Sequence, residues 1–187
     1  MKGYKQLNYF TALWVFIILL LNSCVEEQYD KTKALEQAHT SLNIGYETYL
    51  ASEDINSLLY KVRDLNFEME DIEGIYSLSQ QLVKRTEENI DLLSAEKKDH
   101  NVTSLFESTI TYLESVRLLE ENIPAFVESI VDSTLVDKPE LNQRIAELAM
   151  DVQKKGQDWQ NSKTEFYTAQ NIGQKAIDSI EKLITKK

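Results

Sequence analysis

Very few residues in this chain can interrupt a helix. After residue 23 the sequence contains four glycines and two prolines, and it has no Asn-Gly or Asp-Gly pair of the kind that closes a β-hairpin. Apolar residues recur at helical spacing instead of alternating as they do in a half-buried strand. The sequence therefore predicts an all-α protein.

One apolar pattern steps by seven residues through the middle of the chain. Its members are Ile55, Val62, Met69, Tyr76, Val83 and Ile90, with companion positions at Leu58, Leu65, Ile72, Ser79, Thr86 and Leu93. Heptad spacing predicts a helix that buries one stripe against its neighbours. Gly74 lies inside the pattern, so we expect residues 52–97 to form either one long helix or two.

A second apolar face lies upstream and is out of phase by about one residue. It consists of Leu35, Ala38, Leu42, Tyr46, Tyr49 and Leu50. The phase changes near Ser52-Glu53-Asp54, which are residue types suited to a helix start. A helix boundary is therefore expected there.

Two further helices are predicted downstream. Ser104 and Glu107 have the spacing of a capping box, and Pro124 is expected to kink or break the helix that follows. Pro139 falls in the first turn of the last helix. The apolar positions of that helix are Ile145, Val152, Trp159, Phe166, Gly173 and Ile180.

Together these patterns predict one elongated antiparallel bundle of about four helices with coiled-coil-like packing. We expect it to form a single domain over residues 29–187. Short connections at 98–103 and 133–138 suit antiparallel neighbours.

The first residues have the pattern of a secretory signal. Lys2 and Lys5 precede an almost unbroken apolar run over residues 10–21. As a helix this run would span roughly 18 Å, which is short for a hydrocarbon core of about 30 Å. A short transmembrane anchor is the alternative interpretation.

The only cysteine follows this run directly. Leu21-Asn22-Ser23-Cys24 resembles the lipobox of bacterial lipoproteins, in which an aliphatic, a variable and a small residue precede the lipidated cysteine. The resemblance implies cleavage between Ser23 and Cys24, removal of residues 1–23 as a signal peptide, and acylation of Cys24. Residues 24–28 then form a short tether, and the chain is anchored to a membrane and does not span it.

The residues after the cysteine provide a prediction of where in the cell the protein is located. Glu26 and Glu27 resemble the acidic export tag of Bacteroidota lipoproteins, which implies the outer membrane, on its periplasmic face or at the cell surface. The mature chain also resembles all-helical surface lipoproteins of Bacteroidota and spirochaetes. The residues that carry this likeness are Tyr29-Asp30, Gln37 and 166–172.

Composition and motifs narrow the function. The formal net charge of −11 opposes binding to nucleic acid. No nucleophile elbow or phosphate-binding glycine pattern is present, so we expect no enzyme activity and no cofactor. Glu36 and His39 match half of a di-iron site, but the second half is missing, and the acidic stretch at 68–73 lacks the spacing of a calcium loop. We therefore expect no metal.

Two features remain as candidate sites. Trp159, with Gly156 three residues before it, lies in a polar stretch rich in amides and either lines a recognition groove or fills a gap in the core. Ser133 and Ser179 resemble acceptors for O-glycosylation in Bacteroidota, with ordinary helix-end residues as the alternative.

These expectations point to a lipid-anchored, non-catalytic interaction module of the cell envelope with a protein or glycan partner. The alternative is a structural or stress-related envelope lipoprotein without a specific ligand.

Overall fold

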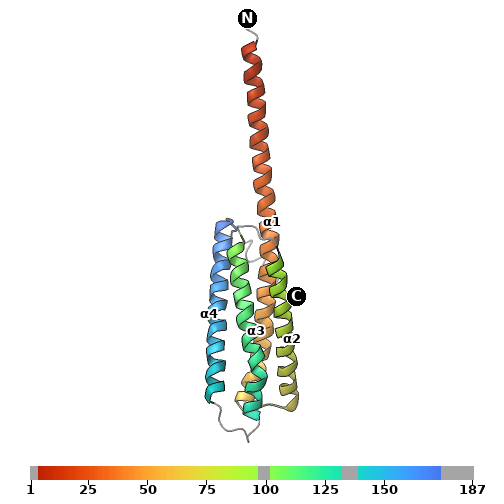
Figure 1. The fold of residues 1–187 in the computed structure, drawn as a ribbon, viewed down its shortest axis with the longest axis vertical. Helices are drawn as coiled ribbons and strands as arrows, with labels where there is room; N and C mark the ends of the chain where they lie inside the picture. The colour runs from red at the N-terminus through yellow and green to blue at the C-terminus, as the bar shows by residue number, and fades with distance from the viewer. Residues whose placement is uncertain (1–3, 97–101, 132–138, 174–187) are drawn as a thin grey trace.

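The protein is an all-α bundle of four antiparallel helices, as the sequence predicts (Figure 1). The computed structural model describes the backbone of residues 4–96, 102–131 and 139–173, and the side chains of these ranges from residue 34 onward. The helices are α1 (Tyr4–Arg63), α2 (Met69–Ala95), α3 (Thr103–Val131) and α4 (Pro139–Ala169). Helix α3 packs against each of the other three.

Helix α1 is longer than the bundle, and its N-terminal part projects from one end (Figure 1). The expected helix boundary at Ser52-Glu53-Asp54 is wrong, because α1 runs through these residues to Arg63. Ser52 is buried, whereas Glu53 and Asp54 are exposed. The change of apolar phase there reflects small polar residues on the buried face and not a new helix.

The break between α1 and α2 falls at residues 64–68. Leu65 adopts a left-handed conformation with a φ of 55°, and the amide of Asn66 donates a 2.9 Å hydrogen bond to the carbonyl of Lys61. Together with a 3.1 Å bond from the amide of Leu65 to the carbonyl of Val62, this is a Schellman ending. Residues 52–97 therefore contain parts of two helices.

Helix α2 begins with a capping box and continues through Gly74. The Asp71 carboxylate accepts a 2.9 Å hydrogen bond from the amide of Glu68, and Glu68 caps the amide three residues on. A Cβ added at Gly74 would lie 3.3 Å from Cδ1 of Leu58 on α1, so the glycine permits close packing here and does not end the helix.

The heptad pattern is only partly buried, because it crosses the turn between two helices. Ile55 and Val62 are buried on α1, but Met69 lies at the start of α2 and is 63% exposed. On α2 the companion positions lie inside instead. The buried residues there are Ile72, Ile75, Ser79, Leu82, Thr86 and Leu93.

The sequence predicts a kink or a break at Pro124, and helix α3 continues through this proline without a break. The helix begins at Thr103, one residue before the predicted cap at Ser104. Helix α4 begins at Pro139, as predicted, and ends at Ala169. Gly173 therefore lies beyond the helix and is exposed, and Ile180 lies outside the described residues.

The bundle interior contains hydroxyl groups as well as apolar side chains. Ser41 on α1 and Thr109 on α3 are fully buried, and their hydroxyl oxygens are 2.8 Å apart. Thr109 also donates a hydrogen bond to the carbonyl of Leu105 within its own helix. Because each hydroxyl has a partner, this pair links α1 to α3 without the cost of an unsatisfied buried group.

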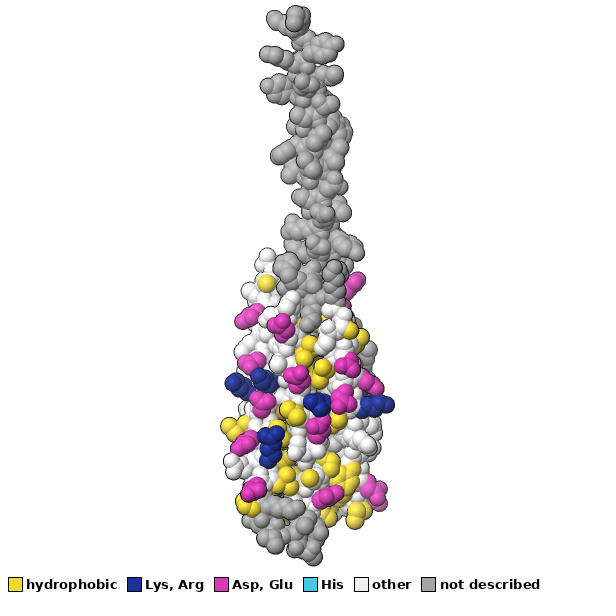
Figure 2. Space-filling model, in the orientation of Figure 1, with side chains coloured by type: hydrophobic (Ala, Val, Ile, Leu, Met, Phe, Trp, Pro, Cys, Tyr) yellow, Lys and Arg dark blue, Asp and Glu magenta, His cyan; other side chains and the backbone are white. Residues whose placement is uncertain are grey.

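The described surface is predominantly acidic. Figure 2 shows acidic side chains spread over this face of the bundle, with hydrophobic side chains gathered toward the end opposite the projecting part of α1. Tyr60, Leu65 and Met69 are exposed near the α1–α2 turn. Within the part of the chain whose side chains are described, no helix has the length and apolarity needed to cross a membrane.

Candidate functional site

A cavity of about 380 Å³ lies where α1, α3 and α4 meet. The backbones of α1 and α4 do not pack closely on each other, so side chains fill the space between these two helices. We call the pocket that remains the α1–α3–α4 cavity. Its lining residues are Tyr49, Ser52, Glu53 and Asn56 on α1, Tyr112 and Leu119 on α3, and Ala149, Val152, Gln153, Gly156, Gln157, Trp159 and Gln160 on α4.

Trp159 and Gly156, the two candidates named from the sequence, both line this cavity. Trp159 is 3% exposed, and its ring stacks on that of Tyr112 with centroids 5.6 Å apart and planes 6° from parallel. The two interpretations of Trp159 are therefore compatible, since its side chain belongs to the core and also forms a cavity wall.

Gly45 on α1 allows Trp159 to occupy this position. A Cβ at residue 45 would lie 2.5 Å from Cζ2 of Trp159, closer than carbon atoms can approach. The indole N–H lies near the same residue and has no hydrogen-bond partner among the described residues. The contact between α1 and α4 thus requires glycine at position 45 on α1, because the Trp159 ring on α4 occupies the space that a side chain would take.

The opening of the cavity carries one carboxylate and one tyrosine among exposed amide side chains. Tyr49 and Glu53 are exposed, so they lie where the cavity meets solvent. Burial raises the pKa of the Tyr112 hydroxyl, and the nearby Tyr49 and Glu53 raise it further. Tyr112 therefore remains a neutral phenol over the physiological pH range.

A buried carboxyl group lies behind this cavity. Glu120 on α3 is 2% exposed, and its Oε2 accepts a 2.8 Å hydrogen bond from Ser79 on α2. Ser52, which lines the cavity from α1, lies close enough to this carboxyl group to affect its pKa. Burial raises the pKa of Glu120 to about 7, although the two serine hydroxyls lower it. Polar side chains from α1, α2 and α3 therefore meet at Glu120.

A second cavity, of about 390 Å³, lies on the other side of Glu120. We call it the α2–α3 cavity; its lining residues are Tyr76, Gln80, Val83, Glu120, Glu121, Pro124 and Glu128. Proline has no amide hydrogen, so Pro124 cannot donate the usual helical hydrogen bond to the carbonyl of Glu120.

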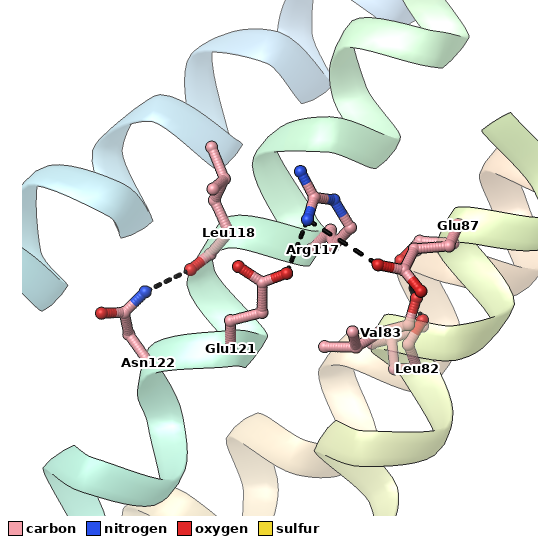
Figure 3. Close-up of polar contacts among 8 residues, drawn as sticks. Leu82, Val83, Glu87, Arg117, Leu118, Glu121 and Asn122 are labelled. Carbon is pink, nitrogen blue, oxygen red and sulfur yellow. Dashed lines mark hydrogen bonds and ion pairs between the residues drawn. The ribbon is translucent and has the colours of Figure 1, made fainter.

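An arginine already neutralises part of the charge beside the α2–α3 cavity. Figure 3 shows the guanidinium of Arg117 between Glu121 on its own helix, at 2.6 Å, and Glu87 on α2, at 3.9 Å. The Arg117 side chain is 30% exposed, so this network is more shielded from solvent than a fully exposed ion pair.

Several predicted site residues lie outside the described side chains. These are Ser23, Cys24, Glu26, Glu27, Ser133 and Ser179. His39 and Glu36 are exposed on α1. In the acidic stretch, Asp71 pairs with Lys61 at 2.7 Å, and its pKa is lowered by the hydrogen bond from Glu68 and by Lys61. Asp71 therefore serves to cap and brace α2.

Sequence reasoning missed most of the cavity, including Tyr49, Ser52, Glu53 and Tyr112 as site residues. Glu120 carried a usable signal, because it falls four residues after Val116 and three before Ile123, on the buried face of α3. Tyr112 carried the same signal, because it lies seven residues after Leu105 and four before Val116. Nothing in the sequence indicated that Tyr49, Ser52 and Glu53 would face α3 and α4, since these residues meet only when the helices assemble. Comparisons with protein-family models, curated proteins and solved structures found no match to this chain.

Proposed function

We propose that this protein is a lipid-anchored binding module of the cell envelope, held at the outer membrane through Cys24, which takes a small ligand into the α1–α3–α4 cavity. The observation that carries the binding part is the cavity itself, which three helices line with aromatic, amide and aliphatic side chains. Ligand sites in proteins are typically concave and mostly apolar, with a few polar groups that orient the ligand.

The anchor part rests on the order of residues from Leu21 to Cys24 and on the position of the cysteine in α1. The backbone is helical from Cys24 to Ala34, the first buried residue of the described core. At about 1.5 Å per residue, this segment would hold the bundle roughly 15 Å from a lipid on Cys24. That spacing would leave the cavity clear of the membrane surface.

The size of the cavity favours a small molecule, or one side-chain-sized group of a larger partner, as the ligand. A protein–protein interface usually buries about 800 Å² on each partner, an area far larger than the opening of a cavity of this volume. A protein or glycan partner would therefore insert one group here and not cover the bundle.

Thermal unfolding tests this proposal. Small molecules extracted from the envelope of the producing cells should raise the melting temperature of the full chain in detergent, because a ligand that binds only the folded state stabilises it. Gly156→Leu should abolish this rise, since the new side chain would extend into the cavity. If the extract changes the melting temperature of neither the wild type nor Gly156→Leu, or raises both equally, the cavity is not a ligand site. The alternative of a structural protein without a specific ligand then stands.

A further inference from the structure

The lining of the α1–α3–α4 cavity carries negative formal charge only. Glu53 is its one residue with a formal charge, and no Lys, Arg or His is among the thirteen described lining residues. Glu53 is exposed on α1 at the opening. A ligand with a positive charge would therefore meet a complementary group at this opening, and an anion would be repelled.

Aromatic residues line the same cavity as this carboxylate. Tyr49 is 45% exposed and lines the opening, while Tyr112 lies deeper. The faces of aromatic rings carry partial negative charge and attract cations, most strongly when water is excluded. A carboxylate and a tyrosine at the opening, with further aromatic rings deeper in the cavity, form a combination that suits an organic ammonium ion.

The deeper walls suit a hydrocarbon group. Leu119 on α3 and Val152 on α4 line the cavity together with Trp159. One face of Trp159 stacks on Tyr112, and the amino group of Lys163 lies 6.0 Å from the centre of the indole ring. Trp159 therefore contributes an apolar wall, and the positions for a cation are at Tyr49 and Glu53.

The α2–α3 cavity does not offer the same chemistry, although three glutamates line it. Arg117 already pairs with Glu121 (Figure 3), and Glu120 accepts a hydrogen bond from Ser79. Glu120 and Glu121 thus have partners within the protein, and the carboxylate of Glu128 lies near Tyr76. The α1–α3–α4 cavity differs because its lining combines one carboxylate with three aromatic residues, of which Tyr49 is exposed.

We propose that the α1–α3–α4 cavity binds a small organic ammonium ion, with its charged end between Glu53 and Tyr49 and its hydrocarbon part against Tyr112 and Trp159. This inference rests on the proposed binding function and adds the chemical class of the ligand.

Fluorescence of Trp159 provides the test. The chain has two tryptophans, so Trp14→Phe leaves Trp159 as the only one in the full-length protein. Choline, benzyltrimethylammonium and the uncharged choline analogue 3,3-dimethylbutan-1-ol are titrated into this protein in detergent. Both cations should give a saturable change, with benzyltrimethylammonium binding more tightly because it buries more apolar surface. The uncharged analogue should bind about tenfold more weakly than choline, because it lacks the cation–π and ionic attraction.

Two neighbouring acidic residues show whether the charge at the opening of the cavity matters, or only the net negative charge of the protein. Glu53→Gln should weaken binding of both cations by about fivefold or more and leave binding of the uncharged analogue unchanged. Asp54→Asn removes the same charge from an exposed neighbour that does not line the cavity, and it should have little effect. Equal effects of the two substitutions would overturn the role of Glu53.

Gly156→Leu tests whether the probes bind inside the cavity. A Cβ at residue 156 would lie 3.5 Å from Cε2 of Tyr112, which is ordinary contact, so a side chain can begin here, and the rest of the leucine should occupy the cavity and abolish binding of all three probes. The melting temperature of Gly156→Leu without probe shows whether the variant is folded. Absence of saturable cation binding, or equal affinity for choline and its uncharged analogue, would overturn the ammonium assignment. If the envelope extract still stabilises the wild type but not Gly156→Leu, the proposed binding function stands with a different ligand class.

Discussion

Ser79 of α2 donates a 2.8 Å hydrogen bond to Oε2 of Glu120 of α3 in the interior of the bundle. The hydroxyl group of Ser52 on α1 lies near the same carboxyl group, so side chains of three helices meet at this acidic residue. An ionised carboxylate at this depth is costly to bury, and two hydroxyl groups compensate only part of that cost.

The first prediction follows from the pKa of Glu120, which burial raises from an ordinary 4.5 to about 7. Between these values the folded state holds a proton that the unfolded state has lost, so the free energy of unfolding should fall as pH rises from about 4.5 to 7. The loss attributable to Glu120 should be at most about 3.5 kcal/mol, from ~1.4 kcal/mol per unit of pKa.

Chemical denaturation at several pH values measures this loss. Glu120→Gln should flatten the profile and be more stable than the wild type at pH 8, because the amide carries no charge. Glu114→Gln on the exposed side of α3 should retain the wild-type profile. A Glu120→Gln profile that parallels the wild type would show that another group controls the dependence.

The second prediction compares alanine at two glycines. Gly45→Ala places a Cβ 2.5 Å from Cζ2 of Trp159, and such overpacking typically costs about 1–3 kcal/mol. Gly156→Ala meets no atom closer than 3.5 Å and should gain up to about 1 kcal/mol from helix propensity. Thermal melts should therefore shift in opposite directions.

A second substitution checks the cause of the Gly45→Ala effect. Combining it with Trp159→Phe should remove most of the clash, because the atoms that an added Cβ would meet belong to the part of the indole that phenylalanine lacks. If the double variant shows the sum of the two separate losses, the contact with Trp159 is not the source of the strain.

The third prediction concerns Trp159→Ala. Removing a buried tryptophan typically costs about 3–5 kcal/mol, which for a chain of this size lowers the melting temperature by roughly 10 °C. The burial of Trp159 leads us to expect this loss, in addition to loss of ligand binding. A melt within ~2 °C of the wild type would mean that the indole is far less packed than its contacts indicate.

Sequence periodicity predicted the four-helix architecture because each helix carries an apolar stripe and few residues interrupt it. It misplaced the boundary between α1 and α2 because the heptad spacing continues across the turn, as Met69 shows. The turn at Leu65 uses a left-handed leucine where glycine is usual, so no residue type marked it.

The candidate site was harder to predict than the fold. Trp159 was a candidate because its neighbours in the sequence are rich in amide side chains. In the structure it contacts Gly45 and Tyr112, which belong to two other helices. Local sequence predicts the face of a helix and not the residues it meets across the bundle. Ser52 and Ser79 share this difficulty, since only the assembled bundle brings them to Glu120.

The proposed anchor at Cys24 is the central claim, because it would place the cavity outside the cytoplasm and near a membrane. Mass spectrometry of the mature protein tests it most directly. The account predicts a tryptic N-terminal peptide covering residues 24–31, heavier than its sequence by the mass of acyl chains on Cys24, and its loss in Cys24→Ser. An unmodified cysteine in a chain that still begins at Met1 would contradict the account.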